Sequence, residues 1–141
     1  MEKIIEERVK TRERAIQEAI EFAKCASRRL GRITAILYGS YARGDFNEWS
    51  DIDVLIVAEN LPRNPIERLD LVEDCVKSHP RVEPVLITLE ELNKLKNKNP
   101  AVIEAFTRGL VLVDDLKLTS QHNQQRLQGR STASQTKSRS R

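Results

Sequence analysis

The sequence predicts one α/β domain, in which helices and strands alternate along the chain. Short apolar runs bounded by turn residues indicate strands at 33–38, 51–58 and 82–87. Before and between these runs, apolar residues recur every three or four positions, which is typical of helices. A chain of 141 residues with 39% hydrophobic content is long enough to bury one core.

A long helix is expected to open the chain. Residues 2–30 have a helical composition with a partial period of three or four, and Gly31 ends the pattern. Such an amphipathic helix can pack on the following domain, extend it or pair with a second copy. We therefore expect an N-terminal helix at 1–31, a main domain at 32–116 and a basic tail at 117–141.

The first strand runs into a turn suited to phosphate. After the apolar residues 33–38, Gly39 and Ser40 form a tight turn, and residues 41–43 begin a short helical segment. Glycine lets the backbone approach a ligand closely, and free N–H groups at a helix N-terminus attract phosphate. The Ser40 hydroxyl adds a donor. This turn is predicted to face a ligand cleft.

Two aspartates follow on the second strand. Gly44 ends the short helical segment, and the polar loop at 45–50 leads into an apolar run that contains Asp51 and Asp53. Side chains alternate along a strand, so both carboxylates point to one face. Because neighbouring like charges repel, something positive must hold them together, most cheaply a divalent cation such as Mg²⁺. The pattern predicts a metal-dependent phosphoryl-transfer site.

The second half of the chain continues the alternation. Residues 65–78 are predicted as one helix and residues 82–87 as the third strand. Pro84 has no backbone N–H to donate and suits an edge strand. Thr88 and Glu91 have the spacing of a capping box that opens the next helix. The last predicted elements are short: helices at 90–98 and 101–108, and an apolar segment at 110–113.

The sequence favours a cytoplasmic location. No apolar run approaches the roughly 20 residues that span a bilayer, and the charged opening residues 1–3 are unlike a signal peptide. Cys25 and Cys75 lie far apart, without CxxC spacing, and each falls in a helical pattern. They are expected to be buried free thiols rather than a disulfide or a metal site.

The segment from 36 to 57 resembles the minimal nucleotidyltransferases of the DNA polymerase β superfamily. Their signature is Gly-Ser, ten residues, then Asp-x-Asp, and Gly39-Ser40 with Asp51-Ile52-Asp53 fits that spacing. The Ala-Arg-Gly segment that contains Arg43, and Ser50 before the aspartates, also match. The resemblance extends over about residues 33–115. It implies a polymerase β-like fold, with a small mixed sheet flanked by helices.

The same resemblance implies a set of site residues. Gly39, Ser40, Arg43 and Ser50 would bind the nucleotide, with ATP as the common donor. Asp51 and Asp53 would hold two Mg²⁺ ions.

A third carboxylate from a later strand completes the family's metal site, and Glu83 is the candidate here. The family more often has Asp at this position. Glu83 can also be an ordinary polar residue on an exposed strand face.

Two side-chain roles stay open on the sequence. Arg43 can bind a nucleotide phosphate, or it can stabilise its loop through an ion pair with Asp45 or Glu48. Tyr41 and Trp49 can stack on a base, or they can pack against the loop as rim aromatics.

The resemblance also implies a partner. Many minimal relatives are the antitoxin half of a toxin–antitoxin pair and adenylylate a tyrosine of a helical HEPN-type ribonuclease. We expect this chain to leave acceptor binding to such a partner, since it has little room for a second domain. An alternative is an antitoxin that acts by binding alone, with no transfer.

The tail suggests a third possibility, an RNA-binding or RNA-modifying factor. Residues 117–141 contain six Lys or Arg and no acidic residue, whereas residues 1–116 have a net charge of −3. The tail is rich in Ser and Gln and poor in large apolar residues, so it is expected to be disordered. A basic tail can hold nucleic acid or an acidic partner, or it can be a solvated extension.

Overall fold

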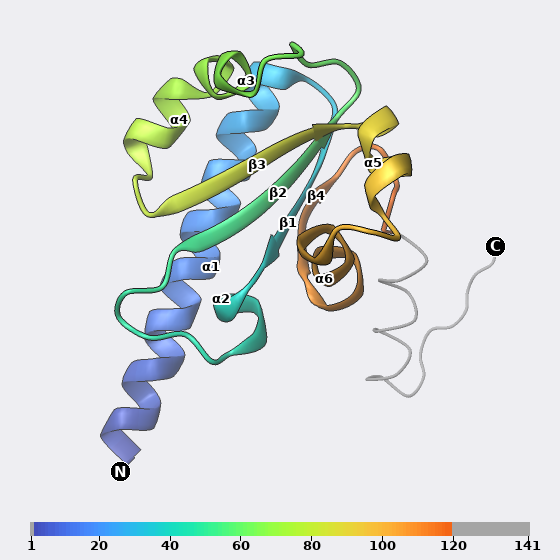
Figure 1. The fold of residues 1–141 in the computed structure, drawn as a ribbon. Coiled ribbons are helices and arrows are strands. Elements are labelled where there is room, and N and C mark those ends of the chain that lie inside the picture. The colour runs from blue at the N-terminus through green and yellow to red at the C-terminus, as the bar shows by residue number, and fades with distance from the viewer. Residues whose placement is uncertain (1, 120–141) are drawn as a thin grey trace, which may run out of the picture.

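The computed structural model describes residues 2–119 and contains a four-stranded sheet with helices on both faces (Figure 1). The elements are α1 (Glu2–Leu30), β1 (Ile33–Tyr38), α2 (Ser40–Arg43), β2 (Ile52–Ala58), α3 (Pro65–Leu71), α4 (Glu73–Ser78), β3 (Val82–Thr88), α5 (Leu89–Leu95), α6 (Pro100–Arg108) and β4 (Leu110–Asp114). This alternation confirms the predicted α/β class.

The sheet is mixed, with the strand order β3-β2-β1-β4. Strand β1 pairs antiparallel with β2 and with β4, while β2 and β3 run parallel. Pro84 lies on β3, which is an edge strand as predicted, and its register partner on β2 is Val54. None of the helices between residues 2 and 119 has both the length and the apolar character needed to cross a bilayer.

Two apolar layers hold the sheet. On one face, α1 packs with α4, and Phe22 and Val72 are among the fully buried side chains. On the other face, α5 and α6 cover the sheet through Leu92 and Val102 (Figure 1). The first three turns of α1 contribute no buried residue, while Ile4 remains 64% exposed. The long N-terminal helix therefore docks through its later turns.

The predicted helix at 65–78 is wrong in one respect, because it is broken at Val72. The backbone there has φ −117° and ψ 25°, and the Val72 side chain is fully buried. Periodicity located the helical region but not this break, which depends on packing against the sheet. The helix predicted at 90–98 also ends earlier, at Leu95, while the Thr88–Glu91 capping box is present as expected.

The prediction of two free thiols is also wrong. Cys25 in α1 and Cys75 in α4 form a disulfide, with their Cα atoms 5.8 Å apart. An Arg29–Asp74 ion pair joins the same two helices. The sequence reasoning failed because nothing local shows that two helices 50 residues apart in the chain will lie side by side.

We expect the disulfide to contribute about 2–4 kcal/mol to the free energy of unfolding, because it closes a 50-residue loop in the unfolded chain. Reduced protein, or a Cys25→Ser/Cys75→Ser variant, should unfold at correspondingly lower denaturant concentration. Thiol titration of the unfolded, unreduced protein should find no free thiol. Two titratable thiols, with unfolding curves unchanged by reductant, would contradict the pairing.

A half-buried ion pair joins α3, β3 and α5. Arg68 is 8% exposed, and its guanidinium donates two hydrogen bonds to the Glu91 carboxylate, at 2.8 and 2.9 Å. Arg68 also donates to the carbonyl oxygens of Pro62 and Leu86. The hydrogen bonds from Arg68 lower the pKa of Glu91 to about 2.

This pair makes stability depend on pH. The folded-state pKa of Glu91 lies below its unfolded value of 4.5, so the gain is complete above pH 4.5 and is lost as pH falls toward about 2. Because the Glu91 side chain is 39% exposed, we expect Glu91→Gln to cost only about 1–2 kcal/mol at pH 7. Denaturant unfolding between pH 2 and 7 measures this difference. The control is Glu90→Gln at the exposed neighbouring residue, which should change the free energy of unfolding very little at any pH.

The predicted boundaries after residues 31 and 116 stay predictions. The predicted disorder of the basic tail falls almost wholly on residues 120–141, which lie outside the described residues.

Candidate functional site

The Gly39 turn lies directly against Asp53. Gly39 has φ +81°, a left-handed conformation that favours glycine. A Cβ atom placed on Gly39 would lie 2.3 Å from Oδ2 of Asp53, which is closer than any real contact. The turn that the sequence predicted and the first helical residues after it, Ser40–Arg43, therefore stand next to the acidic strand.

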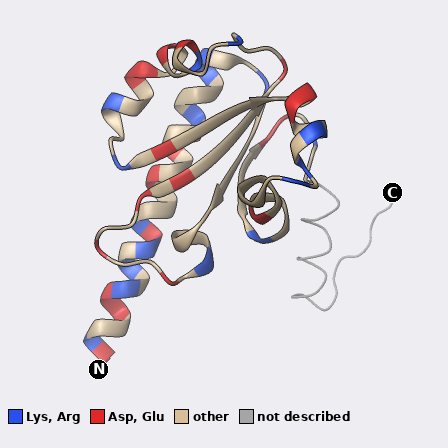
Figure 2. Cartoon of the chain, in the orientation of Figure 1, with Lys and Arg blue, Asp and Glu red and all other residues tan. Residues whose placement is uncertain are grey.

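Three polar side chains line up across the neighbouring strands. Tyr38 at the end of β1 is the register partner of Asp53 on β2, and Asp53 is the register partner of Glu83 on β3. Register partners point to the same face of a sheet, so these residues form a row, called here the acidic row. Figure 2 shows the acidic segments of β2 and β3 side by side.

Two members of the acidic row, Asp53 and Tyr38, have raised pKa values. Burial raises the pKa of the Asp53 carboxyl to about 6, and the charges of Glu83, Asp51 and Glu104 add to that shift. Burial likewise raises the pKa of the Tyr38 hydroxyl to about 12, with a further contribution from Asp53. Negative charge is thus concentrated at this end of the sheet, where a cation would be stabilised.

The donor set suits Mg²⁺, although the carboxylates are not gathered into a finished cage. Carboxylate oxygens are the ligands that Mg²⁺ prefers. Asp53 and Glu83 are adjacent across the strands, while Asp51 lies just before β2. Between residues 2 and 119, no three acidic, His or Cys side chains converge closely enough to enclose an ion. Asp51 and Glu83 are exposed, so their side chains are free to turn toward one.

The remaining candidate nucleotide ligands differ in how they are held. Ser40 opens α2 beside Gly39. The Ser50 hydroxyl oxygen accepts a hydrogen bond from the Asn47 N–H at 2.9 Å. This hydrogen bond closes the loop before β2. Asp51 follows it immediately. Ser50 therefore positions the approach to the acidic row whether or not it touches a nucleotide.

A stacked column supports the loop between α2 and β2. The Tyr41 and Phe46 rings are stacked with centroids 4.6 Å apart. The Arg8 guanidinium covers Phe46, and Arg81 donates to the Tyr41 hydroxyl. Tyr41 is 1% exposed, so the alternative in which it stacks on a base is excluded. Trp49 is 83% exposed, so for this residue base stacking stays a prediction.

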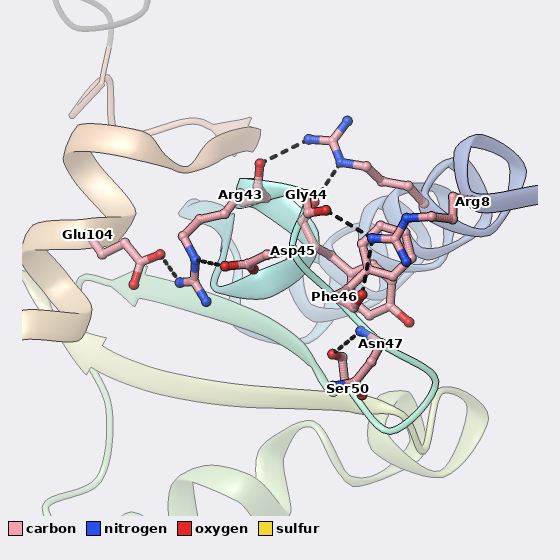
Figure 3. Close-up of polar contacts among 11 residues, drawn as sticks. Arg8, Arg43, Gly44, Asp45, Phe46, Asn47, Ser50 and Glu104 are labelled. Atoms are coloured by element: carbon pink, nitrogen blue, oxygen red, sulfur yellow. Dashed lines mark hydrogen bonds and ion pairs between the residues drawn. The ribbon is translucent and has the colours of Figure 1, made fainter. Parts of the chain in front are cut away.

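Helix α1 fixes this loop through backbone carbonyls. Arg12 donates to the carbonyl oxygens of Tyr41 and Ala42. Arg8 donates to those of Gly44 and Phe46 (Figure 3). These carbonyls lie at and beyond the C-terminal end of α2, where helices leave acceptors unsatisfied. The orientation of the Gly39 turn is therefore coupled to the N-terminal helix.

Arg43 is held by two carboxylates. Its Nε donates to Asp45 at 3.2 Å and its Nη1 donates to Glu104 at 2.5 Å (Figure 3). The loop ion pair with Asp45 is one of the two roles that the sequence left open, while Glu48 is not involved. Glu104 comes from α6, which packs on the other side of the turn.

The comparisons with known proteins agree with this geometry. Residues 19–112, more than half of the chain, match the family model described as "Nucleotidyltransferase domain". The chain belongs to the nucleotidyltransferase domain family. "Putative protein adenylyltransferase MJ1305" of Methanocaldococcus jannaschii is 34% identical to this nucleotidyltransferase over 101 residues, which are 67% of this chain and 68% of the relative.

Two further relatives support the assignment. "Putative protein adenylyltransferase MJ0604" of the same organism is 38% identical over 87 residues, covering 61% of this chain and 79% of the relative. The crystal structure of a "putative nucleotidyltransferase" from Sulfolobus solfataricus has a TM-score of 0.52 and 25% identity, covering 63% of this chain and 80% of that chain. The predicted nucleotidyltransferase fold is confirmed.

Sequence reasoning did not predict the roles of Glu104, Arg8 and Arg12 in this nucleotidyltransferase. Glu104 lies 61 residues after its partner Arg43, and Arg8 and Arg12 contact main-chain atoms about 30 to 40 residues away. Backbone carbonyls have no sequence signature, and local spacing offers only Asp45 and Glu48 as partners for Arg43. A weak signal was available for Glu104, since it is the single acidic residue of its helix.

Proposed function

We propose that this nucleotidyltransferase moves AMP from ATP to a hydroxyl group of a partner protein, in a reaction that requires Mg²⁺. The observation that carries the proposal is the contact between the Gly39 turn and Asp53, with Glu83 in register beside it. It puts a surface for phosphate next to carboxylates that can hold a cation. Nucleotidyl transfer needs both at one point.

Each part of the site then has a task. The turn at Gly39 and Ser40 binds the β- and γ-phosphates, and Arg43 adds a fixed positive charge. This leaves the α-phosphorus over the acidic row. The acceptor oxygen forms a bond to that phosphorus, the bond to pyrophosphate breaks, and the hydroxyl proton is released.

Asp51, Asp53 and Glu83 are the residues that would hold Mg²⁺, and two ions are the expected number. When bound, the metal neutralises phosphate charge and makes the acceptor hydroxyl more acidic. The raised pKa of Asp53 supports this assignment. Burial and neighbouring negative charges make its ionised form unfavourable, and a bound cation would stabilise that ionised form.

For the acceptor, we propose a tyrosine of a HEPN-type helical toxin, so that the chain acts as an antitoxin. The match to the signature of minimal nucleotidyltransferases supports this choice. The names of the two Methanocaldococcus relatives support transfer to protein, since both describe a protein adenylyltransferase. All elements between residues 2 and 119 belong to one sheet and its covering helices.

Labelled ATP tests this proposal. The purified chain is incubated with Mg²⁺ and with either α-³²P-ATP or γ-³²P-ATP, in the presence of a small helical protein from the same genome that carries an Arg-x4-Tyr-x-His motif. Only the α-label should appear on the partner, and EDTA should abolish it. Transfer of the γ-label would indicate a kinase. Label on RNA, lost when residues 117–141 are removed, would favour the RNA-modifying alternative.

A further inference from the structure

Arg43 has donors left over after its two ion pairs are counted. A guanidinium carries five N–H groups. One N–H on Nε is used by Asp45 and one on Nη1 by Glu104, and Nη2 makes no hydrogen bond with any residue between 2 and 119. Two partners at different nitrogens fix the plane of the group. The Nη2 edge of the guanidinium therefore has N–H groups available to a ligand, and the two ion pairs fix the direction in which they point.

The two carboxylates are not equivalent. The Asp45 side chain is 63% exposed and lies two residues from Arg43, so it moves with the same loop. The Glu104 side chain is 27% exposed and belongs to α6, which packs on β1. Glu104 is the contact that ties Arg43 to a rigid element.

A groove provides room for a ligand at this place. Arg43 and Glu104 line an open groove of about 560 Å³ along α6, together with Ile103 and Arg108. Arg108 has no ion pair among the described residues, so the groove contains a second available cation. Glu104 links the groove to the acidic row electrostatically, because its charge contributes to the raised pKa values of Asp53 and Tyr38.

We propose that Glu104 is a positioning residue, which holds Arg43 so that its open edge meets a phosphate of the donor nucleotide in this groove. The inference rests on the proposed function, because it assumes that the ligand is a nucleoside triphosphate. Arg and phosphate form paired hydrogen bonds only when the guanidinium plane is aligned. A carboxylate on a packed helix supplies that alignment before the nucleotide arrives.

The opposite role for Glu104 leads to a different result. Two carboxylates on one guanidinium give a negative local charge. In this opposite role, the Glu104 carboxylate occupies the phosphate position on Arg43 and must be displaced when the nucleotide binds. Removing a competitor tightens nucleotide binding, whereas removing a positioning group weakens it. The sign of the change in the dissociation constant separates these two roles.

Equilibrium dialysis with α-³²P-ATP and Mg²⁺, without acceptor, measures that constant directly. We expect Glu104→Ala to weaken ATP binding about fivefold to tenfold. Glu104→Gln, which keeps an oxygen acceptor, should recover most of the loss. In the transfer reaction the same change should appear in KM for ATP, with kcat altered less than about twofold.

A double-mutant cycle shows whether the effect passes through Arg43. In an Arg43→Ala background, which should itself bind ATP more weakly, Glu104→Ala should change binding no further. The matched control is Glu48→Ala, since Glu48 is an exposed acid of the same loop that does not pair with Arg43.

The outcomes separate the two proposals. If wild type binds ATP and Glu104→Ala binds it equally or more tightly, the positioning role is overturned while the proposed function stands. An additional loss from Glu104→Ala in the Arg43→Ala background also overturns it. If wild type binds no ATP, the proposed function fails as well.

Discussion

Asp53→Asn is expected to lower the rate of AMP transfer by about 10³-fold, or about 4 kcal/mol of transition-state stabilisation. Asp53 lies at the centre of the acidic row, between Tyr38 and Glu83, and against the Gly39 turn. Within residues 2–119, Asp53 is the carboxylate that lies beside the Gly39 turn and is also in register with a residue of β3. Initial rates with labelled ATP, at saturating acceptor, measure this loss.

The same variant should be no less stable than wild type. The folded-state pKa of Asp53 is raised to about 6 from its ordinary 3.8, so in the metal-free protein its ionisation at neutral pH opposes folding. Because this carboxyl is only half-buried, Asp53→Asn should raise the free energy of unfolding by about 1 kcal/mol at pH 7. This gain should disappear below pH 3.8. Thermal unfolding in EDTA should show it. A variant that loses both activity and stability would indicate a structural role instead.

Gly39→Ala is the second change with a large expected effect. The new Cβ would meet Oδ2 of Asp53 at 2.3 Å, in a backbone with φ +81° that an L side chain rarely adopts. Since the Asp53 side chain can rotate away, we expect a modest stability cost of about 1–2 kcal/mol. The displaced carboxylate, however, should reduce transfer about 10²-fold.

Gly31→Ala is the matched control for this substitution. Gly31 has a similar φ of +85°, but nothing lies within 4 Å of the added Cβ. Both variants should lose comparable free energy of unfolding, measured with denaturant, and only Gly39→Ala should lose activity. Equal activity in the two variants would show that the contact between the turn and Asp53 has no part in the reaction.

The fold and the placement of Gly39 beside Asp53 in the candidate site were predictable because their signals are local. Strand β1 ends in the Gly39 turn, and the apolar run around Asp53 marks a buried strand, so each needed only a few consecutive residues. Family spacing then connected the turn with the aspartates. The capping box at Thr88 and Glu91 was equally local, and it is present.

What the sequence did not predict depends on segments that meet only in the folded chain. The Cys25–Cys75 disulfide needs α1 and α4 to be adjacent, and the Arg43–Glu104 pair needs α6 to pack beside the turn. The predicted helix is broken at Val72, whose side chain is fully buried against other elements. In each case the missing information was a tertiary contact and not a residue preference.

The central claim is that the acidic row transfers a nucleotide to protein, and the intact mass of the HEPN-type partner tests it most directly. After incubation with ATP and Mg²⁺, wild type should add the mass of one adenylyl group, which is AMP less one water, to a tyrosine of the partner identified by peptide fragmentation. In the same incubation time Asp53→Asn should modify only a trace of the partner, and Glu48→Ala should match wild type. An unmodified partner that binds wild type and Asp53→Asn equally tightly would contradict the account and indicate an antitoxin that acts by binding alone.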